Sequence, residues 1–587
     1  MKIASIPVSI CLSMLWTIWL FSCEGRKENA EDLKDKDNGW GIPSEAALLQ
    51  QPEFDSAGLA QGKALYDIYC WACHGETGMG DGAAGGAMGS QPANFHSEAV
   101  QAQSSGVLFW KIGEGRGTMP AFADVLTDEQ RWYLVAYIRH LGSGKAEVES
   151  APGPQALREG IKVEHWMKVA PRAIRILYER ERHRLWYVTF EGEVFRFPLD
   201  RPYEVEKVLS VEDHGISRLQ GAALHGNTLY LTGNIRVNDN KGTTGWMMRI
   251  RWDKDQPVVS KVFSTVEYGT TNTPFDHGWS ATAISPDEKY IYVVSGSRTD
   301  HGEVQDNLGA YPGSRDEPLT ARIFRIPIDA EDLLLPNDIE ELKAMGYVYA
   351  EGLRNAFDIE FDGQGNLFAV VNSGDYDQNE DMFWVREGHH YGYPWVMGGM
   401  ETPQQFPGWH PDPENDPFLN TAAVARLDDF YNDPGFAKRP QGVVFTKGMD
   451  NYGPDANKFR DTATGKVMDA SDLKIPITTF TPHSSPLGLV IDREQKLPGP
   501  YKGTAFTLRY TKGSKSGLMK PFTELGEDLL HLEMSYNPEK DNYDLRTTRV
   551  AEGFSQPVDA VLVDNDLFVL EYGGRQRGGN IWKVSIE

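Results

Sequence analysis

Residues 185–197 read Leu-Trp-Tyr-Val-Thr-Phe-Glu-Gly-Glu-Val-Phe-Arg-Phe, two short apolar runs joined by a turn that contains Gly192. Aromatic and β-branched residues in short runs between turn residues predict strands. Another apolar run, around Ile174, precedes the pair. The same order of apolar strand, turn and aromatic–aliphatic strand occurs six times in the chain. The second strands lie at residues 185–188, 229–231, 291–294, 367–370, 505–508 and 567–570.

A unit of several strands that repeats along the chain predicts a β-propeller. The first strands contain Ile174, Ala222, Ala283, Ile359, Leu489 and Val561, and third strands are recognisable at 194–197, 247–250, 323–326 and 581–584. We therefore expect residues 161–587 to form an all-β propeller of six blades. The alternative, a pair of β-sandwiches, does not predict six copies of one pattern. Too many residues separate the fourth and fifth second strands for one blade, which predicts an insertion around 395–470.

In a propeller the first strand of each blade lines the central channel. The residues just before these strands meet at one end of the channel, which we call the mouth. The sequence predicts a polar and partly cationic mouth that contains Pro171-Arg172, Arg218, Asp276-His277, Arg354-Asn355, His483-Ser484-Ser485 and Ser555-Gln556. Position alone leaves two interpretations open, a functional site and a solvated rim.

The composition is that of a globular protein. Of the 587 residues 40% are hydrophobic and 24% are charged, which excludes collagen, a coiled-coil rod and extensive disorder. The 59 glycines, 34 prolines and many aromatic residues favour a large β domain rich in turns. A formal net charge of −26 repels phosphate backbones, so we expect no nucleic-acid partner.

The first 22 residues predict an export signal. Lys2 precedes an almost wholly apolar run from Ile3 to Phe21, and Leu20-Phe21-Ser22-Cys23 resembles the bacterial lipobox, in which the cysteine is acylated after cleavage. Residues 23–50 then form a polar tether. We expect a protein that is exported and lipid-anchored at a bacterial membrane, facing the periplasm or the cell surface. An uncleaved signal anchor is the alternative.

Cys70-Trp71-Ala72-Cys73-His74 is a C-x-x-C-H sequence, the attachment motif of c-type haem. Two thiols bind the two vinyl groups of the porphyrin, and the histidine that follows is placed below the iron. A reducible cysteine pair and half of a zinc site are the alternatives. A zinc site needs two further ligands at short spacing, and His96 is the nearest candidate.

The flanks of this motif favour haem. A helical pattern over residues 57–69 leads into it, and a later helix begins with the capping box Thr127-Asp128-Glu129-Gln130. Residues 51–145 resemble a class I cytochrome c. The resemblance implies one covalent haem c held by Cys70 and Cys73, with His74 and Met119 as iron ligands. Met88 as the ligand, and a packing role for Met119, are the alternatives.

A second resemblance concerns the propeller. Glu351-Gly352-Leu353-Arg354-Asn355-Ala356-Phe357, Gly365-Asn366-Leu367-Phe368, Asn372-Ser373-Gly374-Asp375 and Tyr391-Gly392-Tyr393-Pro394-Trp395 resemble the hallmark region of the soluble glucose/sorbosone dehydrogenase family. Members of that family are six-bladed propellers that oxidise sugars with pyrroloquinoline quinone (PQQ) and calcium. The resemblance is specific here and weak over the rest of residues 160–587.

The resemblance implies roles for individual residues. His277 would be the general base, with Asp276 beside it to orient the ring or raise its basicity. Arg354 and Asn355 would lie next to the quinone carbonyls, and Arg509 would contact the cofactor. The carbonyls of Gly374 and Asp375 would hold calcium, a hard cation that takes backbone oxygens.

Three positions depart from the family pattern. The family has two arginines that face the PQQ carboxylates before its last inner strand, where this chain has Phe554-Ser555-Gln556-Pro557. Asp375 stands where the calcium loop has proline, and Ile216 where a glutamine is expected. Arg218 or Arg298 are candidates to replace the missing arginines from other blades. The departures concern the cofactor more than the fold.

Together these features predict a quinohaemoprotein dehydrogenase. A sugar or related alcohol would be oxidised in the propeller, and electrons would leave through the haem to a one-electron acceptor such as a soluble cytochrome or a respiratory-chain component. Residues 146–160 would be the linker. One alternative is a glycan- or protein-binding propeller that carries an electron-transfer cytochrome. The other is a calcium-dependent propeller hydrolase, which leaves the haem unexplained.

We predict that the chain is cleaved and acylated at Cys23, because Leu-Phe-Ser-Cys closes the apolar run. Cys23→Ser should release the protein from membranes or leave the signal attached, as measured by membrane fractionation and intact mass. An unmodified mature N-terminus elsewhere in the wild-type protein would contradict the assignment.

Overall fold

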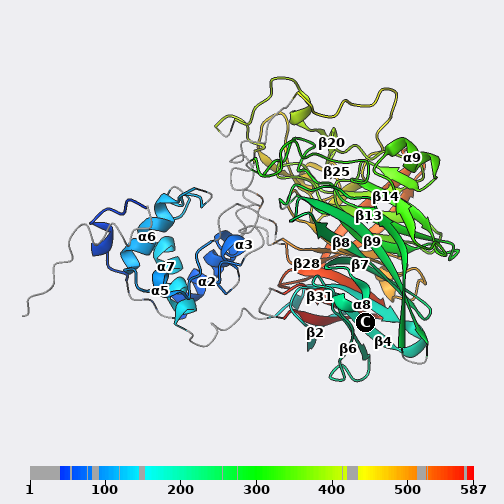
Figure 1. The fold of residues 1–587 in the computed structure, drawn as a ribbon, viewed down its shortest axis with the longest axis horizontal. Helices are drawn as coiled ribbons and strands as arrows, with labels where there is room; N and C mark the ends of the chain where they lie inside the picture. The colour runs from blue at the N-terminus through cyan, green and yellow to red at the C-terminus, as the bar shows by residue number, and fades with distance from the viewer. Residues whose placement is uncertain are drawn as a thin grey trace, which may run out of the picture.

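The computed structural model describes residues 40–587 except 53, 55, 76, 82–91, 118, 124, 144–152, 254–255, 274, 308, 413, 420–433, 512–521, 523, 525 and 574–577. The expected signal, Cys23 and Met88 lie outside these residues. A small helical N-terminal region is followed by a mostly-β propeller (Figure 1). Among the helices of the described residues, none has the length and apolar character needed to cross a bilayer.

The N-terminal region contains η1 (Ala46–Leu48), α2 (Ser56–Tyr69), α3 (Trp71–His74), α5 (Glu98–Gln101), α6 (Ser105–Glu114) and α7 (Asp128–Gly142). The predicted capping box is confirmed: Thr127 accepts from the Gln130 amide, and the Gln130 side chain accepts from the Thr127 amide. Helices α2 and α7 cross closely at Gly62, where a Cβ would lie 2.1 Å from the Tyr133 carbonyl oxygen. Glycine is therefore required at this crossing.

The propeller is built from sheets whose strands follow one another outwards. The innermost strands are β3 (Ala173–Glu179), β7 (Arg218–His225), β12 (Trp279–Ile284), β17 (Ala356–Phe361), β26 (Pro486–Ile491) and β30 (Pro557–Val563). The second strands are β4 (Arg184–Thr189), β8 (Thr228–Val237), β13 (Tyr290–Ser295), β18 (Leu367–Val371), β27 (Ala505–Arg509) and β31 (Asp566–Glu571). All the first and second strands expected from the repeat are therefore confirmed.

The third strands are β5 (Val194–Pro198), β9 (Gly242–Asp253), β14 (Arg322–Pro327), β19 (Asp381–Val385), β28 (Asp528–Asn537) and β32 (Asn580–Ile586). Further out lie β6 (Glu206–Leu209), β10 (Gln256–Thr265), β16 (Val348–Glu351), β29 (Asn542–Glu552) and β2 (Ile161–Lys168), with β1 (Gln155–Ala156), β11 (Tyr268–Gly269), β15 (Leu333–Leu335), β22 (Asp450–Pro454) and β25 (Ile477–Thr478) as additions. Short hairpins β20–β21 (Val396–Met397, Met400–Glu401) and β23–β24 (Lys458–Arg460, Val467–Asp469) stand apart. The connections carry η2 (Arg180–Arg182), α8 (Val211–His214), α9 (Ile339–Ala344), η3 (Pro403–Gln405), α10 (Ala470–Leu473) and η4 (Gly499–Tyr501).

The expectation of a six-bladed propeller is corrected to five full blades within the described residues. Within the described residues five of these sheets have four or more strands, whereas β17–β18–β19 has three. Isolated hydrogen bonds cover the edge of β19 instead of a fourth strand: the Met449 amide donates to the Met382 carbonyl (2.9 Å), and the Met382 amide donates to Thr479 Oγ1 (2.9 Å). The strands that follow in the chain, β22 and β25, join the sheet of β29. Part of the predicted insertion is therefore an extension of that sheet.

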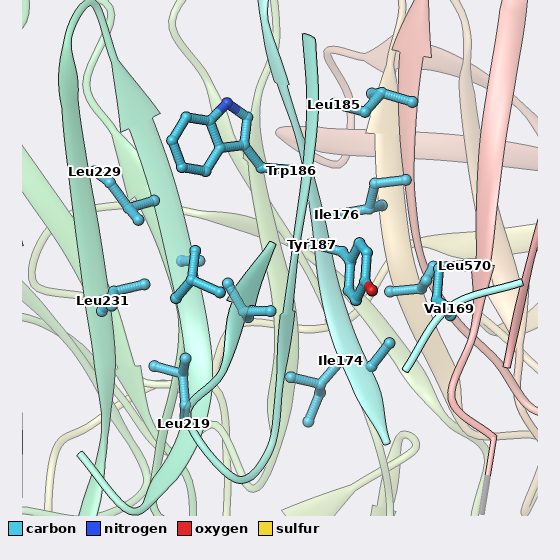
Figure 2. Close-up of a cluster of buried hydrophobic side chains, with 14 of the residues drawn as sticks. Val169, Ile174, Ile176, Leu185, Trp186, Tyr187, Leu219, Leu229, Leu231 and Leu570 are labelled. Carbon is cyan, nitrogen blue, oxygen red and sulfur yellow. The ribbon is translucent and has the colours of Figure 1, made fainter. Parts of the chain in front are cut away.

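The two ends of the β region meet in one sheet. Strand β2 pairs antiparallel with β32, from Ile161 opposite Ile586 to Lys168 opposite Asn580. Hydrophobic side chains from neighbouring sheets fill the space between them (Figure 2), among them Ile174 and Ile176 of β3, Leu219 of β7 and Leu570 of β31. Burial of such side chains is the main source of stability in a sheet-on-sheet core.

The innermost strands pack side by side in a closed order, β3–β7–β12–β17–β26–β30 and back to β3. Each of them carries a β-bulge directly after its first residues. After the bulge, three strands place Arg175, Asp358 and Asp559 at the same register position, and the other three place Gly221, Ala281 and Gly488 there. The two glycines allow neighbouring strands to approach closely: a Cβ on Gly221 would lie 2.0 Å from the Ser280 carbonyl oxygen, and one on Gly488 would lie 2.9 Å from the Cα of Asp559.

Arg175 links several innermost strands. Its guanidinium donates to the carbonyl of Gln220 on β7 (2.9 Å) and to that of Phe357 on β17, and lies 3.7 Å from Asp358 and 3.8 Å from Asp559. The two carboxylates accept from backbone amides of neighbouring strands, Leu489 of β26 (2.8 Å) and Ile176 of β3 (2.9 Å). Burial raises the pKa of both aspartates, against the effect of Arg175.

We predict that Arg175→Gln destabilises the propeller by about 3–5 kcal/mol, because it leaves two buried carboxylates without their cation. The raised pKa values mean that these carboxylates are protonated more readily when folded, so the loss should be larger at pH 8 than at pH 5. Urea denaturation at the two pH values measures this. Arg201→Gln, in an exposed pair with Glu204, is the control and should change little. An unchanged midpoint for Arg175→Gln would contradict the prediction.

Candidate functional site: a haem motif and a polar propeller mouth

The C-x-x-C-H motif forms one helical turn, α3, that begins directly after Cys70. Cys70 and Cys73 are not joined by a disulfide. The Nδ1 atom of His74 lies 3.1 Å from the Ala93 carbonyl oxygen, and its ring stacks on Phe95 at 4.4 Å between centroids. A carbonyl at Nδ1 fixes the tautomer that leaves Nε2 to bind a metal. Burial lowers the pKa of His74, which favours the neutral, ligating form.

The predicted iron ligand Met119 lies in a tight turn. The Arg116 amide donates to the Met119 carbonyl (2.8 Å), and the Met119 amide donates to the Arg116 carbonyl (3.0 Å). The Met119 side chain packs against the same hydrophobic cluster as Cys70 and Trp71. The turn of Met119 and the helix that carries the two thiols therefore pack against one hydrophobic cluster. The alternative ligand, Met88, lies outside the described residues.

The residues expected at the mouth lie at equivalent places around it. In five sheets the carbonyl of the residue before the innermost strand accepts a hydrogen bond from the residue after the second strand. The pairs, acceptor first, are Arg172–Phe190, Gly278–Gly296, Asn355–Asn372, Ser485–Tyr510 and Gln556–Tyr572, at 2.8–3.0 Å. Three aromatic residues from consecutive sheets, Tyr510, Tyr572 and Phe190, form what we call the aromatic arc. Across the mouth the same place is taken by Gly296 and Asn372.

His277 lies at this mouth, beside the smaller residues. Its Nδ1 atom faces the Ser297 carbonyl oxygen (3.2 Å) and Ser297 Oγ (3.3 Å), and Oγ itself donates to the Thr299 carbonyl. Both neighbours of Nδ1 are therefore acceptors, so Nδ1 carries the hydrogen and Nε2 the lone pair. A Cβ on Gly296 would lie 2.6 Å from the Cβ of His277, so this approach requires glycine.

Asp276 does not orient the His277 ring, contrary to the expectation. Its carboxylate binds Arg236 (2.6 Å) and Arg298 (2.8 Å) and accepts from the Thr270 hydroxyl. Burial alone would raise the pKa of Asp276, but the two arginines outweigh it and hold the pKa below the usual range. Burial and then Arg354 lower the pKa of His277 to about 3, although Asp276 acts in the opposite direction. His277 is thus neutral at physiological pH.

Arg354 is buried beside His277 and is held by a loop that sequence reasoning missed. Its Nε donates to the Asp300 carbonyl (2.8 Å), its Nη2 to Asp300 Oδ1 (2.7 Å) and its Nη1 to the Asn372 carbonyl (3.2 Å). Asp300 is fully buried, and its other carboxylate oxygen lies 2.6 Å from His301 Nδ1. Its pKa is lowered because His301 and Arg354 outweigh the effect of burial.

The sequence of the loop that holds Arg354 contains a pattern that indicates its role. Residues 295–303, Ser-Gly-Ser-Arg-Thr-Asp-His-Gly-Glu, follow a second strand without an apolar residue, and every one of them is buried. Polar residues that are buried together hydrogen-bond one another. Glu303 accepts from the His301 amide (2.7 Å) and from Gln305 (2.6 Å), and burial, with Asp300 nearby, raises its pKa. The loop is a polar support behind Arg354.

The expected calcium ligands lie next to this support. The Asp375 amide donates to both oxygens of Asp300, at 3.2 and 3.1 Å. A Cβ on Gly374 would meet His301 Cε1 at 2.3 Å, so glycine is required there. Burial and then Asp300 raise the pKa of the Asp375 carboxyl. In the described part of the chain no group of three or more His, Cys, Asp or Glu side chains is placed to hold a metal ion.

Arg509, which the resemblance places at the cofactor, is bound to carboxylates within the fold. Its side chain is fully buried, and Nε and Nη2 bind the two oxygens of Asp528 at 2.8 and 2.6 Å. Nη1 donates to Glu524 (3.1 Å). An arginine saturated by two carboxylates has a structural role in β27.

The second mouth histidine differs from the first. His483 Nε2 lies 2.7 Å from Asp377, which also binds Arg460. Burial would lower the pKa of His483, but the bond to Asp377 outweighs it and the pKa is raised. An imidazole whose Nε2 is already bound to a carboxylate is less available to accept a proton from a substrate. His277 is therefore the better candidate for a base.

The N-terminal region and the propeller resemble different known proteins. Residues 57–138 match the family model described as cytochrome C oxidase, cbb3-type, subunit III. Cbb3-type cytochrome c oxidase subunits CcoP are 35% identical over 98 residues in Azospirillum brasilense and 36% over 92 in Azospirillum sp. strain B510, in each case 16% of this chain. The chain spans about a third of these relatives, 33% and 31% of their lengths. The N-terminal region is a cytochrome c domain.

The solved structures similar to this chain cover the propeller. The apo-form of the soluble aldose sugar dehydrogenase from Escherichia coli is 13% identical with a TM-score of 0.45, covering 73% of this chain and 100% of its own. The holo PQQ domain of pyranose dehydrogenase from Coprinopsis cinerea is 14% identical with a TM-score of 0.45, covering 74% and 97%. Likeness at this level says nothing about the cofactor or substrate of this chain.

We predict that Met119 ligates the haem iron opposite His74. Met119→Ala should abolish the long-wavelength sulfur-to-iron band of the ferric protein and lower the reduction potential, because a thioether ligand raises it. Absorbance spectra and a redox titration measure the two effects. Met88→Ala is the matched control and should leave both unchanged. If Met119→Ala retains the band, Met88 becomes the ligand.

Proposed function

We propose that this protein is a dehydrogenase that oxidises a sugar or related alcohol at the propeller mouth and passes the electrons to its own haem c. One observation carries the proposal: a neutral histidine, His277, presents an unprotonated Nε2 beside the buried cation Arg354, in a chain that also carries a cytochrome c domain. A base next to a fixed cation suits removal of a hydroxyl proton while negative charge develops nearby.

The residues of the mouth fit PQQ, a planar ring with three carboxylates. The aromatic arc of Tyr510, Tyr572 and Phe190 is half-buried and offers ring surfaces. Arg172 and Arg218 lie over Phe190, with 4.2 and 5.3 Å from guanidinium carbon to ring centroid. Flat apolar rings beside cations are the surroundings that a planar polyanion requires. When bound, PQQ would accept the two electrons that leave the substrate carbon and give them up singly to haem.

The chain's own residues would supply positioning and proton transfer. His277 Nε2 would take the hydroxyl proton, with Nδ1 held by Ser297. Arg354 would stay fixed by Asp300, and Asn355 would face the same side of the mouth. The carbonyls of Gly374 and Asp375 would hold calcium. Asp276 would act at a distance, by holding Arg236 and Arg298 in place.

The location of the protein and its electron acceptor are the next part of the proposal. We propose that a lipid on Cys23 anchors the exported chain to a bacterial membrane, facing the periplasm or cell surface. Residues 23–50 would be the tether and 146–160 the linker between the cytochrome and the propeller. The haem would reduce a one-electron acceptor such as a soluble cytochrome or a respiratory-chain component.

The direct test of the function uses the full chain with haem attached. PQQ and calcium are added to the oxidised protein, followed by a panel of neutral and acidic sugars, and reduction of the haem is followed by its absorbance. Reduction that requires both PQQ and a sugar supports the proposal. No reduction with any sugar would overturn it and favour a propeller that binds a glycan or protein.

We predict that His277→Ala lowers the rate of haem reduction by substrate by about 10²–10⁴, because the hydroxyl proton loses its acceptor. PQQ affinity should stay near that of the wild type, since Nε2 acts on the substrate. His483→Gln is the internal control and should have a smaller effect on the rate. Haem reduction at the wild-type rate in His277→Ala would remove the assignment.

A further inference from the structure

Arg218 is a half-buried cation at the mouth for which the described residues supply no carboxylate or hydrogen-bond acceptor. Its guanidinium carbon lies 5.3 Å from the centre of the Phe190 ring. Burial, Arg236 and Arg172 lower its pKa to about 10, although Asp276 acts in the opposite direction, so it is charged at neutral pH. A half-buried arginine without an anionic partner lowers the stability of the fold. Its presence therefore indicates that it binds a ligand.

The carboxylates around Arg218 are engaged elsewhere. Asp276 binds Arg236 and Arg298, and Glu191 binds Arg172 from an exposed position. None of these acidic groups lies within ion-pair distance of Arg218, and the nearest charges include two cations. The local field therefore attracts an anion from solution.

Arg172 contacts the same ring as Arg218. Its guanidinium carbon lies 4.2 Å from the Phe190 centroid, and its Nε donates to the Tyr572 hydroxyl (2.7 Å). Its backbone is left-handed, with φ of +55°, an unfavourable conformation for a residue with a side chain. Two arginines thus lie against one aromatic ring, at the edge of the aromatic arc.

We propose that Arg218, with Arg172 next to it, binds a carboxylate of the planar cofactor and so replaces the arginine pair that the last blade lacks. The inference rests on the proposed function. Arginine suits this task because its planar fork binds carboxylates through two parallel hydrogen bonds. The cofactor would then be anchored from the sheets of β3 and β7, which leaves His277 and Arg354 to the reacting side.

Equilibrium binding tests this directly. PQQ is titrated into the full-length apo-protein with calcium, and quenching of tryptophan fluorescence gives the dissociation constant. Arg218→Gln should weaken binding about 10- to 100-fold, the effect of one lost charge-assisted contact. Arg172→Gln should weaken PQQ binding less, because Arg172 is already bound to the Tyr572 hydroxyl and to Glu191. Arg218→Lys should recover part of the affinity that Arg218→Gln loses. Arg201→Gln, in an exposed ion pair with Glu204, is the control and should leave the affinity unchanged.

Thermal unfolding separates binding from folding damage. Arg218 has no ion-pair partner in the described residues, so Arg218→Gln should keep or raise the melting temperature without ligand. PQQ should raise the melting temperature of the wild type more than that of the variant. A wild-type affinity in Arg218→Gln overturns the inference. So does a loss of affinity confined to Arg575→Gln, a position outside the described residues.

Two further experiments distinguish a carboxylate of the cofactor from a carboxylate of the substrate. Benzene-1,2,4-tricarboxylate, a planar polycarboxylate without a quinone, should compete with PQQ in the wild type and not in Arg218→Gln. If it binds through Arg218 while PQQ gives no haem reduction with any sugar, the anion site stands and the proposed function fails. If Arg218→Gln raises KM for acidic sugars and leaves PQQ affinity unchanged, the site holds the substrate and the inference is overturned.

Discussion

The interaction between Arg175 and the two aspartates at the axis is the constraint on which the propeller depends. One guanidinium reaches carbonyls of β7 and β17 and the carboxylates of Asp358 and Asp559. The aspartates in turn bind amides of β26 and β3. Five of the six innermost strands are thus tied to one buried charge. Such a cluster is sensitive to the loss of any member, and it fixes the register of the strands whose first residues form the mouth.

Register explains why the mouth is uneven. Each innermost strand carries its own bulge after its first residues, and in five sheets the residue before it bonds the residue after the second strand. The residue after the second strand differs in size from sheet to sheet. Tyr510, Tyr572 and Phe190 fill one side, whereas Gly296 and Asn372 leave the other open to His277 and Arg354. The aromatic side offers a surface for binding, and the open side offers a base and a fixed cation. The same scaffold therefore places aromatic rings on one side of the mouth and the pair His277 and Arg354 on the other.

The sequence was enough to place the strands, the haem motif and the capping box, because these depend on local patterns of apolar residues, cysteines and caps. It also predicted which segments meet at the mouth. It did not predict how those residues pair. Asp276 is next to His277 in sequence, yet it binds Arg236 and Arg298, and Arg509 is saturated by Asp528 and Glu524. Such pairings join residues far apart in the chain, and a single sequence carries no signal for them. In the described residues β19 has no fourth strand at its edge. The sequence did not predict this either, because strand pairing also joins residues far apart in the chain.

The pairing of β2 with β32 also bears on how the protein is made. Ile161 lies opposite Ile586, so the sheet that contains both cannot be completed until β32 has been synthesised. Until then β2, the outermost strand of that sheet, lacks β32 as its neighbour, and contacts of such large sequence separation form slowly. A chain that loses β32 would expose the edges of β2 and β31 to other chains. Closure of the β region therefore depends on a strand that lies far in sequence from the two cysteines of the C-x-x-C-H motif.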